Sequence, residues 1–237
     1  RPKGVRRQPP KAEQTAGVQD MLNAVCGFLP WLDDPEAMRV LLSGPIYHST
    51  PNAWLGTFHG LGANIFVAAK FDPEQMLANV ERHRITHLLA VPTMFVRLMK
   101  LPEKVRSAYD ISSMQTIIHA AAPCPIPVKR SIIEWFGPIV HEYYAGTEGN
   151  GFVYCNSEMW LAHPGGCTVH ICGDDLEDLP RFESGTIYFE GGAQFEYHND
   201  AQKTASSRHP KGWSTLGDVG YQDDDNFLFL TDRKAYM

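Results

Sequence analysis

Residues 86–100 read THLLAVPTMFVRLMK, a short apolar run followed at once by a segment that opens with proline. A short apolar run bounded by a turn signal is typical of a buried strand. Proline suits the first turn of a helix, where its missing N–H would have no bond to make. The stretch therefore predicts a strand over 86–91 and a helix over 92–100.

The same order of strand and helix recurs on both sides of this stretch. Four further strands are expected, in RVLLSGPI (39–46), NIFVAA (64–69), MQTIIHAA (114–121) and PIVHEYY (138–144). Three further helices are expected, in PNAWLGTFHGLG (51–62), DPEQMLANVERHR (72–84) and PVKRSIIEWFG (127–137). Such alternation argues for right-handed βαβ units, and so for an α/β fold with a mostly parallel sheet flanked by helices. Ligands of such sheets bind beyond the carboxyl ends of the strands.

The pattern changes after about residue 160, where helical periodicity ends. Short strands are expected in TVHIC (168–172), GTIYFEG (185–191) and NFLFL (226–230), with turn clusters between them. Short strands separated by turns are typical of an antiparallel sheet. We therefore predict an α/β subdomain over residues 1–160, followed by a small antiparallel, barrel-like or sandwich subdomain over 161–232.

The composition is that of an ordinary globular protein with a net negative charge. Of 237 residues, 43% are hydrophobic and 20% are charged, and the formal net charge is -6. This balance argues against disorder, and a negative charge without a basic block argues against a nucleic-acid partner. No stretch approaches the roughly 18 apolar residues of a membrane helix. Five cysteines without a C-x-x-C pair indicate reduced thiols, so we predict a cytoplasmic protein without a transmembrane segment.

A polar, glycine-rich loop follows the strand expected at 138–144. It reads HEYYAGTEGNG (141–151) and stands where a parallel sheet places its ligands. Its backbone N–H groups and the Thr147 hydroxyl can bind a phosphate, Glu148 offers a hard oxygen ligand for Mg²⁺, and Tyr144 offers an aromatic face for a base. The plain alternative is a glycine-rich turn with a threonine and a glutamate on the surface.

Three further segments carry residues that suit a nucleotide. In the opening RPKGV, Lys3 can place its ammonium against a phosphate. In GWSTLGDVGY (212–221), Asp218 is expected in a turn, where one carboxylate can accept both hydroxyl hydrogens of a ribose. In LTDRKAYM (230–237), Arg233 can contact the same sugar or a phosphate. The alternatives are a solvated terminal lysine, an ordinary turn and a charged strand end.

In their order along the chain, these segments resemble the motifs of the adenylate-forming superfamily, which comprises acyl-CoA synthetases, luciferases and the adenylation domains of peptide synthetases. The matching segments are RPKGV, similar to the end of the phosphate loop; PIYHS (45–49), at the acyl pocket; HAAAPCP (119–125), beside the adenine; YAGTE (144–148), the threonine-glutamate signature; TLGD (215–218), the ribose motif; and TDRK (231–234), before the hinge. The sequences TDRKAYM and YHSTPNAW most resemble bacterial fatty-acyl-CoA synthetases.

The resemblance implies an AMP-forming carboxylate–CoA ligase that acts in two steps. A carboxylate attacks the α-phosphorus of ATP, which releases pyrophosphate and leaves an acyl-adenylate, and the CoA thiolate then displaces AMP. The resemblance thus implies ATP, Mg²⁺ and CoA, a carboxylic acid and in particular a fatty acid as substrate, and a homodimer as one possible assembly. Catalysis would rest on charge neutralisation and alignment, because the first step brings two anions together.

The resemblance also implies a role for each matched residue. Lys3 and Thr147 would contact phosphate, and Glu148 would hold Mg²⁺. Asp218 and Arg233 would hold the ribose. The remaining nucleotide contacts would come from Tyr144, stacked on the adenine, and from Ala121, Ala122, Pro123, Glu142, Tyr143, Ala145 and Gly146.

The acyl pocket is expected around the segment PIYHS and the helix that follows it. His48 would stand near the substrate carboxylate as a further catalytic residue, with a histidine of the core as the alternative. Trp54, Phe58 and His119 would line the pocket, while Ala120 leaves space for an alkyl or aryl tail. Aromatic residues at helical spacing are equally typical of an ordinary core.

The chain departs from the superfamily pattern at both ends and in three places between them. It begins after the threonines, serines and glycines of the phosphate loop and ends at Met237, where a hinge leads to a domain with a catalytic lysine. Ala121 and Ala145 stand where the superfamily often has glycine, and HPGGCTVH (163–170) is shorter than usual. We therefore expect the central part of an acyl-CoA synthetase N-terminal domain, with 233–237 starting the hinge and little or no turnover by the isolated chain.

Two other functions fit the same residues. A non-catalytic nucleotide-binding or interaction module would keep the fold without the missing parts. An adenylating enzyme of another kind would load the phosphopantetheine arm of a carrier protein instead of CoA. Pyrophosphate exchange and CoA-dependent release of AMP distinguish these functions from the synthetase.

Overall fold

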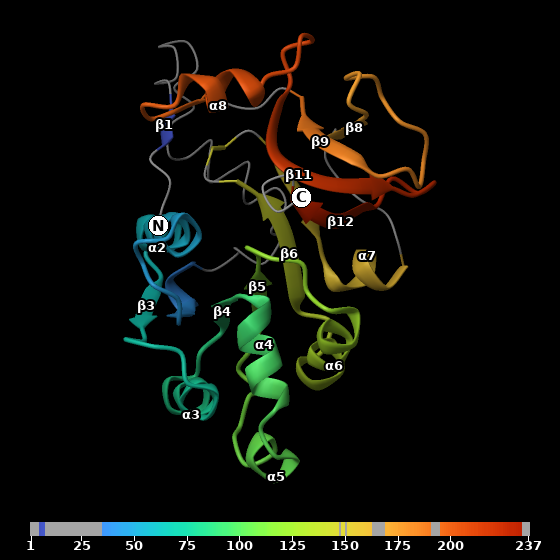
Figure 1. Cartoon of the computed structure of the whole chain (residues 1–237). Helices are drawn as coiled ribbons and strands as arrows, with labels where there is room; N and C mark the ends of the chain where they lie inside the picture. The colour runs from blue at the N-terminus through green and yellow to red at the C-terminus, as the bar shows by residue number, and fades with distance from the viewer. Residues whose placement is uncertain are drawn as a thin grey trace. The chain divides into compact units, whose positions relative to one another are not determined.

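The computed structural model describes residues 5–7, 35–146, 148–149, 151–162, 169–190 and 195–233 (Figure 1). They belong to two compact units, which we call the α/β unit, formed by Lys11–Glu142, and the β unit, formed by Arg1–Pro10 and Tyr143–Met237. The chain passes from one to the other within strand β6 (Val140–Ala145). Residues 163–168, near the predicted subdomain boundary, and 234–237, in the predicted hinge, lie outside the described residues.

The main sheet has the strand order β3-β2-β4-β5-β6-β7, and the neighbours from β3 to β6 are parallel. Its other strands are β2 (Arg39–Leu42), β3 (Asn64–Val67), β4 (His87–Ala90), β5 (Thr116–His119) and, in the β unit, β7 (Phe152–Cys155). Its helices are η2 (Pro35–Ala37), α2 (Ser49–Gly60), α3 (Pro73–His83), α4 (Pro92–Met99), α5 (Glu103–Arg106) and α6 (Ile126–Phe136). The predicted mostly parallel sheet with helices between its strands is confirmed.

Strands β4 and β5, at the centre of the main sheet, show why the sequence predicts the strands and helices of this unit. All four residues of each strand are buried, and Leu88 pairs with Ile117 while Ala90 pairs with His119. A strand that is covered on both faces has an unbroken apolar sequence rather than an alternating one. Each strand leads toward a helix that packs apolar residues inward, so strand and helix are encoded by adjacent segments.

The β unit is built on an antiparallel sheet with the strand order β12-β11-β9-β8. Its strands are β8 (Val169–Cys172), β9 (Gly185–Phe189), β11 (Ser214–Gln222) and β12 (Leu228–Arg233). A second, two-stranded sheet pairs β1 (Val5–Arg7) with β10 (Phe195–Tyr197). The predicted antiparallel sheet is confirmed.

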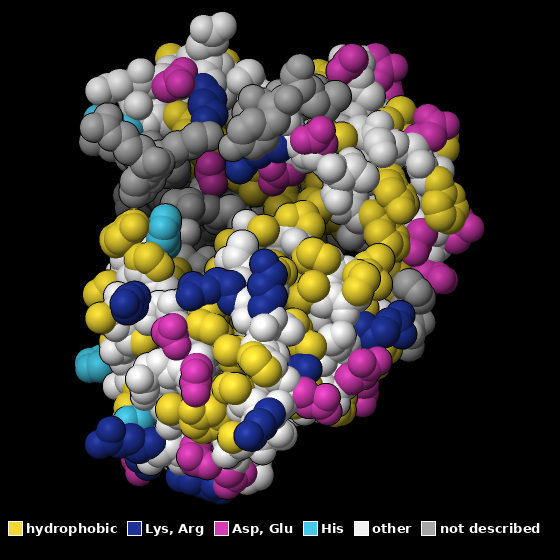
Figure 2. Space-filling model, turned by 60° about the horizontal axis from the view of Figure 1, so that its bottom comes forward, with side chains coloured by type: hydrophobic (Ala, Val, Ile, Leu, Met, Phe, Trp, Pro, Cys, Tyr) yellow, Lys and Arg dark blue, Asp and Glu magenta, His cyan; other side chains and the backbone are white. Residues whose placement is uncertain are grey.

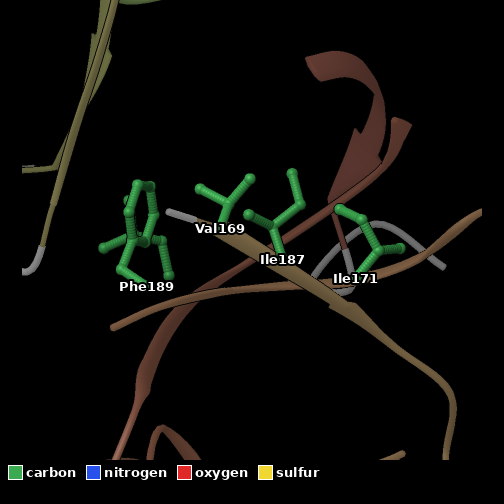
Figure 3. Packing of buried hydrophobic residues seen from close by; sticks show 5 residues of the cluster. Val169, Ile171, Ile187 and Phe189 are labelled. Atoms are coloured by element: carbon green, nitrogen blue, oxygen red, sulfur yellow. The ribbon is translucent and has the colours of Figure 1, made fainter. Parts of the chain in front are cut away.

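One face of the larger antiparallel sheet forms the core of the β unit. Val169 pairs with Phe189 and Ile171 with Ile187, and the four side chains rise from the same side of the two strands (Figure 3). Alternate residues of a strand point to the same face, which gathers these side chains into one cluster with Leu216. Tyr144 packs against this cluster, which places the end of β6 beside the sheet.

Short helices occur where the sequence predicted only strands and turns. They are α7 (Ser157–Ala162), at the predicted subdomain boundary, and α8 (Ala201–Ser206), within the region predicted to contain short strands and turns. The side chain of Asp200 accepts a hydrogen bond from the Lys203 N–H at 2.9 Å and caps α8. A helix of six residues is too short to show apolar periodicity, and the cap was the available sequence signal.

The surface carries mixed charge. On the face drawn in Figure 2, Lys and Arg side chains are interspersed with Asp and Glu side chains rather than gathered by sign. This mixture is typical of a surface that faces water. Within the described ranges, no helix combines the length and the apolar character that crossing a bilayer requires.

Candidate functional site

Three of the predicted nucleotide-binding residues meet in the β unit around the carboxylate of Asp218. The hydroxyl of Tyr144, from β6, donates a hydrogen bond to Asp218 Oδ2 at 2.7 Å. Arg233, from the end of β12, forms an ion pair with Asp218 through Nε, 3.1 Å from Oδ1. Arg233 also donates through Nη2 to the Leu216 carbonyl at 3.3 Å, which holds the guanidinium in place. The carboxylate is thus oriented on both of its oxygens by residues from two other strands.

An irregular stretch of β11 places Asp218 at this point. The segment was predicted as a turn, and that prediction is wrong, because residues 214–222 form one strand. The register shifts between Thr215 and Val219 relative to β9, and Gly217 has a φ of 80°, a conformation that favours glycine. Asp218 still pairs directly with Arg233 in the β11–β12 ladder. The irregularity resembles a turn in sequence because glycine interrupts the alternation of the strand.

Tyr144 is fixed as a hydrogen-bond donor. Burial, together with the charge of Asp218, raises the pKa of the phenol well above its ordinary value, so the hydroxyl keeps its proton at neutral pH. Its ring lies 5.4 Å from that of Phe189 in the core cluster. Asp218 retains 16% exposure of its side chain, and its two oxygens have further lone pairs beyond these two bonds. The carboxylate can therefore accept additional hydrogen bonds.

Glu148 lies in the same unit and is almost fully buried. It is 6% exposed, and its Oε1 accepts a hydrogen bond from the Tyr197 hydroxyl at 2.8 Å. Gly146 approaches it so closely that a Cβ there would lie 2.8 Å from Glu148 Oε2 and 2.6 Å from Leu216 Cδ2. A side chain at position 146 would therefore require the ends of the Glu148 and Leu216 side chains to move. Sequence reasoning missed Tyr197, whose partner lies 49 residues away.

The surroundings of Glu148 fit Mg²⁺ in one particular way. The part of the chain that the structure describes has no group of three or more His, Cys, Asp or Glu side chains suited to a metal ion. Mg²⁺ in nucleotide sites is commonly bound by one or two carboxylates together with waters and substrate phosphates. A single carboxylate such as Glu148 is compatible with that mode of binding.

Other predicted nucleotide contacts follow strands β5 and β6. Ala121, Ala122 and Pro123 come directly after β5 and are exposed, and Ala121 has a φ of 79°. A positive φ in alanine costs on the order of 1–3 kcal/mol, a cost that glycine would not have. On β6, Tyr143 is half-buried and Ala145 exposed. Lys3 and Thr147, predicted to contact phosphate, lie outside the described residues.

Glu142, whose side chain is 27% exposed, contacts two buried residues of the α/β unit. It forms an ion pair with Lys129 of α6, and the Nε2 atom of His119 lies 3.7 Å from Glu142 Oε2. Burial and the Lys129 charge lower the pKa of His119 to about 3, so its ring is neutral. Sequence reasoning did not single out Lys129, which is buried together with Ile132 and Ile133 of the same helix. Its spacing from these isoleucines was the available signal.

The residues predicted for the acyl pocket also lie in the α/β unit. His48 is exposed just before α2, with its ring 4.6 Å from that of Tyr47, so the alternative of a core histidine is wrong. Trp54 and Phe58 are buried on α2, and their rings stack at 5.5 Å. Ala120 is buried directly after β5.

The family of the chain follows from a match over most of its length. A family model described as AMP-binding enzyme matches residues 1–196. The chain belongs to this family of AMP-binding enzymes, and the predicted membership of the adenylate-forming superfamily is confirmed.

Several curated relatives are CoA ligases. The long-chain-fatty-acid–CoA ligase of Bacillus subtilis is 28% identical, over 86% of this chain and 38% of its own length. The 2-succinylbenzoate–CoA ligase of Bacillus pumilus is 26% identical, over 99% of this chain and 47% of its own length. The 4-coumarate–CoA ligase 2 of Nicotiana tabacum is 29% identical, over 73% and 34% respectively. The chain spans less than half the length of these relatives.

Solved structures share the fold. The O-succinylbenzoate coenzyme A synthetase of Bacillus subtilis, in complex with AMP, has a TM-score of 0.74 and 24% identity, covering 99% of this chain and 47% of that one. An amide bond synthetase from Marinactinospora thermotolerans has a TM-score of 0.73 and 23% identity, covering 91% and 45%. These likenesses confirm the predicted fold class.

Proposed function

We propose that the chain is the nucleotide-binding part of a carboxylate–CoA ligase, which uses ATP to convert a carboxylic acid into an acyl-adenylate and then into acyl-CoA. The observation that carries this proposal is the convergence of Tyr144 and Arg233 on the partly exposed carboxylate of Asp218. A carboxylate held in this way suits the two hydroxyls of a ribose. The CoA ligases among the relatives support the same reaction.

Residues of the β unit bind the nucleotide in this proposal. Asp218 accepts hydrogen bonds from the ribose hydroxyls, and Arg233 donates to the sugar or to a phosphate. The ring of Tyr144 offers a face to the adenine. On the resemblance alone we assign further contacts to Ala121, Ala122 and Pro123 after β5, to Glu142, Tyr143 and Ala145 on β6, and to Gly146 directly after β6.

The first chemical step joins a carboxylate oxygen to the α-phosphorus and breaks the bond to pyrophosphate. Both reactants are anions, so Lys3, Thr147 and Arg233 would reduce their repulsion and align them. Glu148 would hold Mg²⁺, which when bound neutralises phosphate charge. In the second step the CoA thiolate attacks the acyl carbon, and AMP leaves with the electron pair of the broken bond.

A fatty acid is the substrate that we propose. The relative from Bacillus subtilis named for long-chain fatty acids matches 86% of this chain, and TDRKAYM and YHSTPNAW resemble the same class of enzyme. We assign His48 to the carboxylate of the acid, and Trp54, His119 and Ala120 to its apolar tail. A small residue such as Ala120 suits an alkyl chain better than a charged group.

The test is ATP–pyrophosphate exchange by the complete gene product with a panel of fatty and aromatic acids. We expect exchange with fatty acids and release of AMP that depends on CoA. Absence of exchange with every acid would contradict the proposal in favour of a binding module. Exchange without CoA-dependent release of AMP would instead indicate loading of a carrier protein.

A further inference from the structure

The hydrogen bond between Tyr197 and Glu148 has no part in the function proposed so far. It joins the loop after β6 to strand β10, with an O–O distance of 2.8 Å. Glu148 is 6% and Tyr197 is 7% exposed. A buried carboxylate needs a donor, because it has lost most of its contact with water. The phenol is therefore an important partner for Glu148 within its own unit.

The position of Tyr197 is set by contacts that do not involve Glu148. Its N–H donates to Thr204 Oγ1 at 2.9 Å, and the ammonium of Lys203 lies 4.2 Å from the centre of its ring. The ring of Phe195 meets it edge to face at 5.4 Å, and β10 pairs with β1. Helix α8 and the small sheet thus fix the ring, and the ring in turn fixes the hydroxyl.

The other carboxylate oxygen of Glu148 lies near Gly146. A Cβ at Gly146 would lie 2.8 Å from Oε2, whereas Oε1 accepts the hydrogen bond from the Tyr197 hydroxyl. Mg²⁺ requires a nearly fixed octahedral arrangement of oxygens, and groups that orient its ligands affect its binding strongly. We infer that Tyr197 is a positioning residue, which orients the Glu148 carboxylate toward the Mg²⁺ of a bound nucleotide. This inference rests on the proposed function, in which Glu148 is the metal ligand.

The experiment measures binding of Mn²⁺, a paramagnetic substitute for Mg²⁺, to the 237-residue chain with a non-hydrolysable ATP analogue. The free ion is followed by electron paramagnetic resonance in wild type, Tyr197→Phe, Glu148→Gln and the double variant. Tyr197→Phe should weaken Mn²⁺ binding about tenfold or more, which is typical when a partner of a ligand is lost. In the Glu148→Gln background the same change should have no further effect, because the tyrosine acts through the carboxylate.

Two controls separate positioning from folding. Tyr188→Phe removes another buried phenol hydroxyl of the β unit, in a separate cluster with Cys172 and Trp213, and should bind Mn²⁺ as wild type does. Binding of the nucleotide alone, in the presence of a chelator, should be unchanged in Tyr197→Phe. Loss of that binding would make Tyr197 a structural residue and overturn the inference.

The remaining outcomes distinguish the inference from the proposed function. Wild-type affinity in Tyr197→Phe, with weak binding in Glu148→Gln, would overturn the inference alone. The same holds if the two changes weaken binding additively. Wild-type affinity in Glu148→Gln, or no binding of Mn²⁺ with nucleotide by the wild-type chain, would remove Glu148 from the metal role, and the inference with it.

Discussion

Each unit of the molecule holds one carboxylate between a cation and a ring side chain, and the two arrangements differ in their access to water. In the α/β unit the cation is the buried member: the side chain of Lys129 is 0% exposed and that of its partner Glu142 27%, beside the buried ring of His119. In the β unit the cation is the open member: the side chain of Arg233 is 41% exposed and that of its partner Asp218 16%. A buried cation depends on its partner for folding, whereas a partly exposed cation adds little stability and can exchange water for a ligand. In the proposed function, the first pair therefore contributes chiefly to folding and the second to ligand binding.

Lys129→Met is expected to have the largest effect, and the effect is on stability. Removing the Lys129 ammonium leaves the Glu142 carboxylate, 27% exposed, without its cation, so the free energy of unfolding should fall by about 1–3 kcal/mol. Urea denaturation followed by tryptophan fluorescence measures this change. Arg130→Met, which removes an exposed charge from the same helix, should stay within about 0.5 kcal/mol of wild type. Equal losses of stability in the two variants would show that Lys129 contributes no more to folding than a surface charge does.

Asp218→Ala is expected to affect nucleotide binding more than stability. Hydrogen bonds to a charged group contribute about 1.5–3 kcal/mol, so calorimetric titration should show ATP binding weaker by about 10- to 150-fold. Stability should fall by about 1–2 kcal/mol, because the Tyr144 hydroxyl loses its acceptor. Asp224→Ala, at an exposed carboxylate in the turn between β11 and β12, is the matched control and should bind ATP as wild type does.

The complete gene product sharpens this prediction. There, Asp218→Ala should raise the requirement for ATP much more than the requirement for the acid. An equal rise in both requirements would indicate that Asp218 is a structural residue of β11. Asp218 and Glu142 would then both serve folding rather than ligand binding.

Acid is expected to destabilise the α/β unit through its buried histidines. Burial lowers the pKa of His119 to about 3 and that of His87 and His141 to about 4, against an ordinary value of 6.5. Below pH 6.5 the unfolded chain takes up protons that the folded unit does not. The free energy of unfolding is therefore undiminished above pH 6.5 and decreases as the pH falls toward the folded-state pKa values.

Replacement of His119 measures its share of this acid sensitivity. His119→Leu should reduce the slope of stability against pH by up to about 1.4 kcal/mol per pH unit between pH 6.5 and 4.5. Urea midpoints at several pH values give the slope, and His59→Gln, at an exposed position of α2, is the control. An unchanged slope in His119→Leu would show that the ring is not a neutral buried group.

The parts of the fold that were predicted are those encoded by neighbouring residues. Strand β4 and helix α4 are adjacent, and each carries its own apolar pattern, so no distant contact was needed to recognise them. The same holds for β8 and β9, which turn clusters separate. Asp218 was recognised as a candidate, but its strand was not, because the shift in register depends on how β11 meets β9.

The parts that were missed depend on distant partners. A lysine in an amphipathic helix usually faces water, and Lys129 is tolerated in the interior because Glu142 lies opposite. Tyr197 gave no local signal either, since its role depends on a carboxylate 49 residues earlier. Polar contacts between distant elements form only in the folded chain, so the local patterns of a single sequence do not predict them.

Tyr144→Phe is expected to have the smallest effect and tests how Asp218 is held. The change removes one partner of the carboxylate, but Arg233 Nε remains 3.1 Å from Oδ1, and the ring can stay against Phe189. ATP binding should weaken about fivefold, equivalent to about 1 kcal/mol, in a calorimetric titration. Tyr221→Phe, whose ring stacks on Phe229 at 4.8 Å in the same sheet, is the control and should bind as wild type does. A loss of affinity as large as that of Asp218→Ala would contradict this prediction. It would mean that Asp218 and Arg233 do not hold the ribose without the Tyr144 hydroxyl.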